Sequence, residues 1–471
     1  MQTEQLPDIA PDPQPPQPVR LPPPRYYALD SVRATAMLLG VVYHSLLFGM
    51  MGGPAPGASG LGDPARWVQE WLHSFRMPLF FLISGFFGQM MFKKYARREY
   101  FRRRWSRIGI PLALGLVTFV PAYVLTRDLT TPRFAGPPPG PPASAPALRA
   151  QAEHPRLLAS KSDRPRIPMP GGPPRATPAA RSGPPGPFAA PGDSIAEHLM
   201  GRYARFFQLH HLWFLWYLLI FVTAAPLVVG LLAWLLPRPV AENMGRRLMR
   251  YGLAPLALGI AITPLLMLMP GMFGWSLGLC PAIFRGFPDF LLHIDPDMGF
   301  YFLFFLAGWW LFSVRQELPR LSDTWILNAV VGFAAFVAAT LLSATYSPQP
   351  DLPYYGLIRM TGCLLYCVGS AATSFAFLGV FMRFLDRPIF AWRYLADTAL
   401  WVYLIHQPLV LIGLAIVRPW NFVWWLQMAV VSLLAVAAAL AMYELLVRPT
   451  MLVRLFGPTK SLASQRPDGT T

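Results

Sequence analysis

The sequence predicts an all-α, polytopic membrane protein, and three observations lead to that fold class. Of its 471 residues, 54% are hydrophobic and 13% are charged, whereas a soluble domain usually carries about 25% charged residues. The mean hydropathy is +0.39. Apolar runs close to the ~20 residues that span a bilayer recur between Tyr26 and Val447. A soluble fold of this composition would lack the polar side chains needed to cover its surface.

The apolar runs predict about ten transmembrane helices. In chain order the runs cover residues 27–50, 74–92, 108–126, 211–236, 251–270, 299–314, 325–346, 357–382, 395–417 and 422–447.

Basic residues in the short connecting segments predict the orientation of these helices. The segment after the second run is rich in lysine and arginine, and Glu99 is its one acidic residue. Because such residues are enriched on the cytoplasmic side of a membrane, we expect this segment inside. Counting spans from it places both termini in the cytoplasm. The same count places the other short basic clusters there: Arg238, Arg246, Arg247 and Arg250; Arg315 and Arg320; and Arg383, Arg387 and Arg393.

This distribution of charge also argues against nucleic acid as a partner. The net charge is +17, but the basic residues lie in short loops between apolar runs, so membrane topology explains them. The 3 cysteines are too few for a disulfide framework. Histidines and carboxylates do not recur at the close spacing of metal ligands, so we expect no bound metal.

Segments rich in proline divide the chain. Residues 1–24 are expected to be a disordered arm, and residues 127–196 a flexible external insertion, because neither composition can bury enough apolar surface to fold. The rest of residues 25–456 forms the transmembrane domain, and residues 457–471 form a cytoplasmic tail.

The first apolar run carries the clearest candidates for chemistry. Arg33 and His44 are eleven positions apart, which places them on one helix face, about 20° out of line and about 16 Å apart. Asp30 lies one turn before Arg33 and can pair with it. The arginine could hold an anionic donor, and the histidine could act as base on a hydroxyl. An interfacial ion pair and a helix–helix hydrogen bond are the alternative reading, and these residues alone leave both open.

Other candidates lie near the ends of the runs. Arg76 is expected at the external end of the second helix, where it could reach headgroups or a cavity, and Ser84-Gly85 allows close helix approach. Arg104 and Arg107 share a helix face and could clamp phosphates or a carboxylate. The enrichment of basic residues on the cytoplasmic side of a membrane explains the presence of these two arginines about equally well.

Aromatic and histidine-rich segments add three more candidates. His211 and Trp213 open the fourth helix and could stack on a sugar, although an interfacial aromatic belt is the simpler reading. His406 lies inside the ninth helix.

At these residues the sequence resembles membrane acyltransferase family 3, and within it most closely the glucan succinyltransferase group. The matching stretches are Tyr27-Ala28-Leu29-Asp30-Ser31-Val32-Arg33-Ala34 through His44, His73-Ser74-Phe75-Arg76-Met77 through Gly85, Arg104-Trp105-Ser106-Arg107 with Pro111, His211-Leu212-Trp213-Phe214-Leu215, and Tyr403-Leu404-Ile405-His406. The Pro-rich insertion departs from the pattern of the glucan group and leaves the acceptor open.

The resemblance implies an enzyme of a bacterial-type inner (plasma) membrane. It implies transfer of an acetyl or succinyl group from cytoplasmic acyl-CoA, with no tightly bound cofactor, to a hydroxyl of a glycan or another cell-envelope carbohydrate. Arg33 and His44 match the family's helix-one arginine and histidine, of which the histidine is the residue taken as catalytic, and Arg104 and Arg107 match its Arg-x-x-Arg motif. We expect His44 and Arg33 to take part in catalysis, and Arg104 and Arg107 to bind the donor. We expect substrate contacts from Asp30, Arg76, His211, Trp213 and His406.

Two other classes of protein remain as alternatives. A transporter or exporter of an acylated glycan or lipid would be expected to show inverted repeats and paired broken helices, and the sequence has no visible internal repeat. A membrane scaffold would not need ionisable residues along a buried helix face.

Overall fold

The computed structural model describes residues 26–51, 64–134, 208–269, 296–347 and 349–457. The longer helices in chain order are α1 (Tyr27–Met51), α2 (Pro64–Lys94), α3 (Arg97–Leu114), α4 (Val120–Phe134), α7 (Trp213–Leu235), α8 (Arg238–Arg250), α9 (Ala254–Met267), α11 (Pro296–Ser313), α12 (Leu321–Tyr346), α13 (Tyr355–Phe384), α14 (Phe390–Val417) and α15 (Trp424–Met442). A π-helical turn, Gly115–Phe119, joins α3 to α4, and a second, Tyr443–Val447, extends α15 toward the short α16 (Val453–Phe456).

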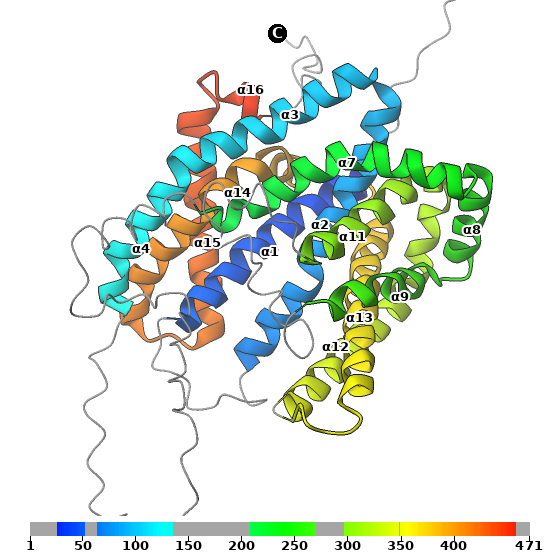
Figure 1. The fold of residues 1–471 in the computed structure, drawn as a ribbon. Coiled ribbons are helices and arrows are strands. Elements are labelled where there is room, and N and C mark those ends of the chain that lie inside the picture. The colour runs from blue at the N-terminus through cyan, green and yellow to red at the C-terminus, as the bar shows by residue number, and fades with distance from the viewer. Residues whose placement is uncertain (1–25, 52–63, 135–207, 270–295, 348, 458–471) are drawn as a thin grey trace, which may run out of the picture.

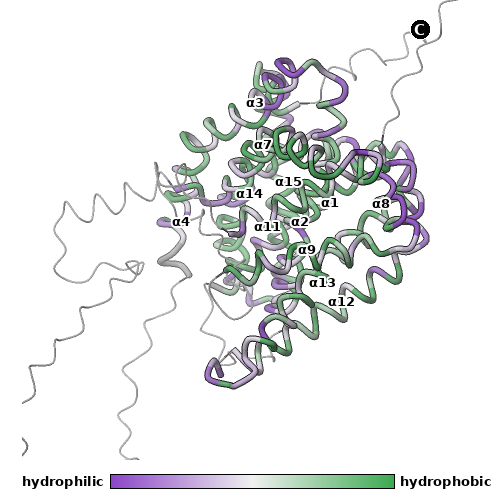
Figure 2. The backbone as a smooth tube through the Cα atoms, turned by 45° about the vertical axis from the view of Figure 1, so that its right-hand side comes forward, coloured by the Kyte–Doolittle hydropathy of each residue, from purple (hydrophilic) through white to green (hydrophobic). Residues whose placement is uncertain are grey.

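The structure confirms an all-α, polytopic membrane fold. Within the described residues, 8 helices are long and apolar enough to cross a bilayer, or 9 if α8 and α9, which meet at a bend of 116°, form one span. Each of the predicted apolar runs overlaps a helix within the described residues, and the run at 299–314 overlaps α11, which is not among those spans. In Figure 2 apolar positions follow the long helices, whereas hydrophilic positions gather on α8 and near the start of α3.

Two predicted boundaries were wrong. Helix α2 begins at Pro64 rather than at residue 74. Hydropathy missed its first turns because they are polar, with Arg66 paired to Glu70 at 2.9 Å. Arg76 therefore lies well inside the helix and is only 8% exposed. Helix α4 continues to Phe134, so the first residues of the predicted 127–196 insertion are helical. The predicted arm at 1–24, the insertion from 135 to 196 and the tail from 458 onward lie outside the described residues.

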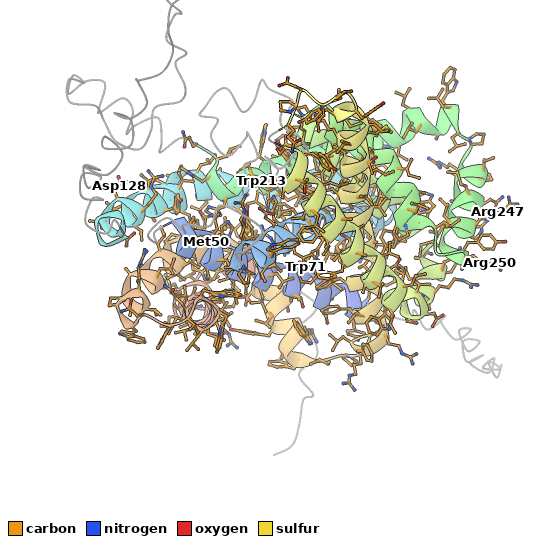
Figure 3. All side chains as sticks on the ribbon, turned by 90° about the horizontal axis from the view of Figure 1, so that it is seen from below. Met50, Trp71, Asp128, Trp213, Arg247 and Arg250 are labelled. Carbon is orange, nitrogen blue, oxygen red and sulfur yellow. The ribbon has the colours of Figure 1, made fainter. Side chains whose placement is uncertain are left out.

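Helix α1 occupies the middle of the bundle (Figure 1), where it packs against α2, α13, α14 and α15. Helix α2 also packs along α11, and α12 pairs with α13 at one side of the molecule. In Figure 3, Arg247 and Arg250 of α8 lie at one edge of the molecule and Asp128 of α4 at the opposite edge. The central position of α1 brings its polar face against other helices rather than toward lipid.

Candidate active site

The ionisable side chains of α1 point toward the interior of the bundle. Arg33 Nη2 donates to the carbonyl oxygen of Ala396 at 3.2 Å, and His44 Nδ1 lies 3.0 Å from Nε2 of His406. Both contacts reach α14, so Arg33 and His44 lie on one side of α1, as their spacing predicts.

The hydrogen bonds of the histidine pair assign its tautomers. His406 Nδ1 lies 2.6 Å from the carbonyl oxygen of Tyr403. A carbonyl only accepts, so the Nδ1 of His406 carries the hydrogen and its Nε2 is the acceptor. His44 Nδ1 also lies 2.9 Å from the carbonyl oxygen of Gly40. The Nδ1–H of His44 therefore points at Gly40 and His406, and the lone pair of neutral His44 resides on Nε2.

The two histidines differ in access. His406 is 2% exposed and the neighbouring His211 is 5% exposed, whereas His44 is only partly buried. His44 is thus the member of the pair that keeps accessible surface, and a substrate would meet it first. This geometry suits a general base that is oriented by a second, buried imidazole.

A group of arginines lies toward the start of α1. Arg33 lies 3.5 Å from Asp30, as the spacing of these two residues predicts. Arg104 Nη2 donates to the carbonyl oxygen of Phe87 at 2.8 Å. Arg33, Arg104 and Arg107 are close enough to interact electrostatically. Side chains from α1 and α3 therefore gather positive charge at the end of the bundle that the basic segments predict to be cytoplasmic.

His211 and Trp213 lie inside the helix packing. His211 Nε2 donates to the carbonyl oxygen of Leu404 at 3.1 Å, and the Tyr403 hydroxyl donates to the carbonyl oxygen of His211. Trp213 is 7% exposed and packs against Phe81 and Tyr301. These contacts hold the start of α7 against α14 and α11, and leave little surface for a sugar.

The sequence patterns do not predict two tyrosines of the site. The guanidinium of Arg76 lies over the ring of Tyr43, 4.6 Å from its centroid, and the backbone of Tyr403 orients His406. Both tyrosines stand close to a histidine in the sequence, in Tyr43-His44 and Tyr403-Leu404-Ile405-His406. That proximity was the one available signal.

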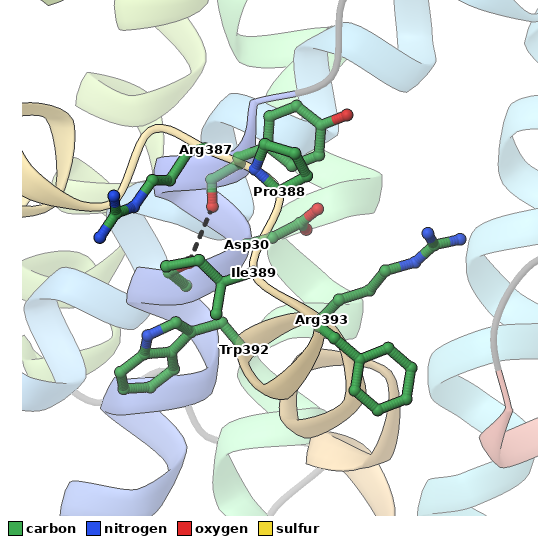
Figure 4. Close-up of a pocket in the computed structure, with 9 residues that line it drawn as sticks. Asp30, Arg387, Pro388, Ile389, Trp392 and Arg393 are labelled. Atoms are coloured by element: carbon green, nitrogen blue, oxygen red, sulfur yellow. Dashed lines mark hydrogen bonds between the residues drawn. The ribbon is translucent and has the colours of Figure 1, made fainter.

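A pocket opens beside Asp30, between the start of α1 and the start of α14 (Figure 4). Its lining residues are Tyr27, Asp30, Ser31, Arg387, Pro388, Ile389, Phe390, Trp392 and Arg393. Arg387 and Arg393 extend to opposite sides in Figure 4, so the pocket does not concentrate positive charge as the Arg33 group does. Among the residues that the structure describes, no group of three or more histidines, cysteines or carboxylates is arranged to hold a metal ion.

A comparison with known families identifies this all-α membrane protein as an acyltransferase. Residues 26–444 match the family model described as an acyltransferase domain. The match covers most of the chain, so the chain belongs to this acyltransferase family, and the resemblance to membrane acyltransferase family 3 is confirmed.

The chain is also similar to curated proteins named glucans biosynthesis protein C. Those from Salmonella paratyphi B (strain ATCC BAA-1250 / SPB7) and Salmonella heidelberg (strain SL476) are each 38% identical to it over 111 residues. The matched stretch covers 22% of this chain and 28% of each relative. No solved structure matches the chain.

Proposed function

We propose that this chain is an O-acyltransferase of the inner membrane. It moves an acetyl or succinyl group from cytoplasmic acyl-CoA to a hydroxyl of a glycan or another envelope carbohydrate. The observation that carries the proposal is the contact of His44 with His406, which leaves the Nε2 lone pair of His44 free to accept a proton. The relatives' name, glucans biosynthesis protein C, supports a glucan as the acceptor.

Acyl transfer to a hydroxyl requires a base that removes the hydroxyl proton and a group that later accepts that proton. His44 Nε2 removes the proton of the acceptor hydroxyl as the hydroxyl oxygen attacks the thioester carbonyl. The resulting tetrahedral intermediate then collapses: the C–S bond breaks, and the thiolate of CoA leaves and takes the proton back from His44. His406 accepts from the Nδ1–H of His44 and fixes its orientation through both steps.

The arginine group would hold the donor. Acyl-CoA carries several phosphate charges, and Arg33, Arg104 and Arg107 offer guanidinium groups that suit phosphate oxygens. Asp30 positions Arg33. Arg33 and His44 are about 16 Å apart along α1, so a donor held by its charged end could place its thioester beside the base.

Mass spectrometry of periplasmic glycans and envelope lipids tests the proposal. Cells that express the wild-type chain should carry an ester-linked acyl mass that His44→Ala cells lack at equal protein abundance. Ser45→Ala is a matched control, because Ser45 is the neighbouring buried residue and contacts Ser432 on α15 rather than the histidine pair. If His44→Ala cells carried the same ester, His44 would not be the general base.

A transporter without chemistry would give a different result with purified protein. The enzyme in lipid nanodiscs should release free CoA thiol from acyl-CoA when an acceptor glucan is present. A transporter would release none, even if the ester were present in cells.

A further inference from the structure

Arg76 is a buried cation without a carboxylate partner in the part of the chain that the structure describes. It lies in the interior of α2 and is 8% exposed. Its Nε atom is buried and has no hydrogen-bond partner there, and no Asp or Glu of the described residues forms an ion pair with it. A guanidinium inside a membrane protein is costly, and such groups usually face a cavity or a functional partner.

The neighbours of Arg76 compensate its charge only in part. The ring of Tyr43 lies under the guanidinium, and Tyr301 and Tyr403 are close enough to interact electrostatically. Neutral rings and hydroxyls stabilise a cation less than a carboxylate does. The site therefore has positive charge available for an anionic ligand.

Gly40 fixes where that charge lies. A Cβ atom at Gly40 would be 2.8 Å from Nη1 of Arg76, so the guanidinium rests directly against α1. The carbonyl oxygen of the same residue is an acceptor for His44 Nδ1, one helical turn away. Arg76 is also close enough to His44 and His406 to interact with both electrostatically. The cation and the base therefore border the same turn of α1.

We propose that Arg76 is the catalytic cation that binds the anionic oxygen formed on the thioester carbon during acyl transfer. This inference rests on the proposed function. When the acceptor oxygen bonds to the carbonyl carbon, the C=O electron pair moves onto the carbonyl oxygen, and the proton goes to His44. A guanidinium held beside that oxygen stabilises the charge as it develops. When the intermediate collapses, the charge leaves with the thiolate.

The position of Arg76 argues against two other anionic ligands for its guanidinium. The donor phosphates would bind at Arg33, which lies seven residues, about 10 Å, before Gly40 along α1. A lipid headgroup would need an exposed guanidinium, and this one is buried. A succinyl group carries its own carboxylate, which is a third anion that Arg76 could bind. An acetyl group has no carboxylate, so a comparison of the two donors distinguishes this alternative.

The test uses the full chain in lipid nanodiscs with two donors, acetyl-CoA and succinyl-CoA, and a glucan acceptor. Arg76→Gln should lower kcat by about 100-fold or more with both donors, while the affinity for CoA stays within about threefold of wild type. Arg76→Lys should restore part of kcat, because it returns the charge without the planar guanidinium.

Gly40→Ala provides a second variant that keeps the charge. Its added methyl group would displace the guanidinium from α1, so kcat should fall with both donors at a similar affinity for CoA. This variant keeps the proposal testable if Arg76→Gln does not fold. Arg66→Gln is the matched control, since it removes one arginine from the same helix at an exposed ion pair, and it should leave kcat unchanged.

Three results would overturn the role of Arg76: a kcat for Arg76→Gln within threefold of wild type, a loss confined to CoA affinity, or a loss confined to succinyl-CoA. The last result would make Arg76 a ligand for the acyl carboxylate. Failure of the proposed function looks different, because the wild-type chain would then release no thiol, or His44→Ala would be as active as wild type.

Discussion

Gly85 of α2 and Gly308 of α11 form the two sides of one backbone contact. A Cβ atom on Gly85 would lie 1.9 Å from the carbonyl oxygen of Phe305, and a Cβ atom on Gly308 would lie 1.7 Å from that of Leu82. The two helices can pack this closely only because both positions lack a side chain. The contact fixes α2, the helix that carries Arg76, closely against α11.

Gly85→Ala should destabilise the protein, because the added methyl group would force α2 and α11 apart. We expect a loss of about 1–3 kcal/mol, the usual cost of overpacking a tight contact, measured as a lower Tm of the purified protein in detergent. The control is Gly230→Ala on α7, where a Cβ atom would meet nothing within 4 Å. A Tm for Gly85→Ala equal to that of the control would contradict the contact.

His406→Gln and His406→Phe should differ in activity. Glutamine keeps an acceptor for the Nδ1–H of His44, whereas phenylalanine keeps the ring and removes the acceptor. We expect kcat to fall about 100-fold for phenylalanine and clearly less for glutamine. The KM for acyl-CoA should stay near wild type in both, because His406 acts through His44. Equal kcat values for the two variants would show that the ring, and not its acceptor nitrogen, matters.

Arg107→Gln should weaken donor binding more than turnover. Arg107 is exposed at the predicted cytoplasmic end and lies near Arg33. If it holds the donor as proposed, its loss removes one charged contact to that donor. We expect a KM for acyl-CoA about 10-fold higher and a kcat within about threefold of wild type. Arg102→Gln, also exposed on α3, should change neither value. An unchanged KM for Arg107→Gln would place the donor elsewhere.

Local periodicity predicted the parts of the site that lie on one helix. The ion pair of Asp30 with Arg33 and the shared face of Arg33 and His44 follow from helix geometry alone. The close approach at Gly85 could also be expected, because small residues permit helix contact in membranes.

Contacts between distant helices could not be predicted from one sequence. His44 and His406 are 362 residues apart, and no local pattern records that they meet. Arg76 was misplaced because hydropathy ends the second span where polar residues begin, although the helix continues through Arg66 and Glu70. His211 and Trp213 resemble an interfacial belt in sequence, and only the packing shows them to be buried.

On the proposed function, in which Arg33 holds the charged end of the donor, the separation of Arg33 and His44 sets a minimum length for the donor. About 16 Å of helix is roughly half of the ~30 Å hydrocarbon thickness. A donor anchored by its charges at Arg33 would deliver its thioester near the midplane of the bilayer. An acceptor that approaches from the other side of the membrane would then have to pass through only one leaflet to reach the thioester. An activated acyl compound too short to cover that distance would leave one end of the site empty. Molecular length, as well as charge, would then decide which donors react.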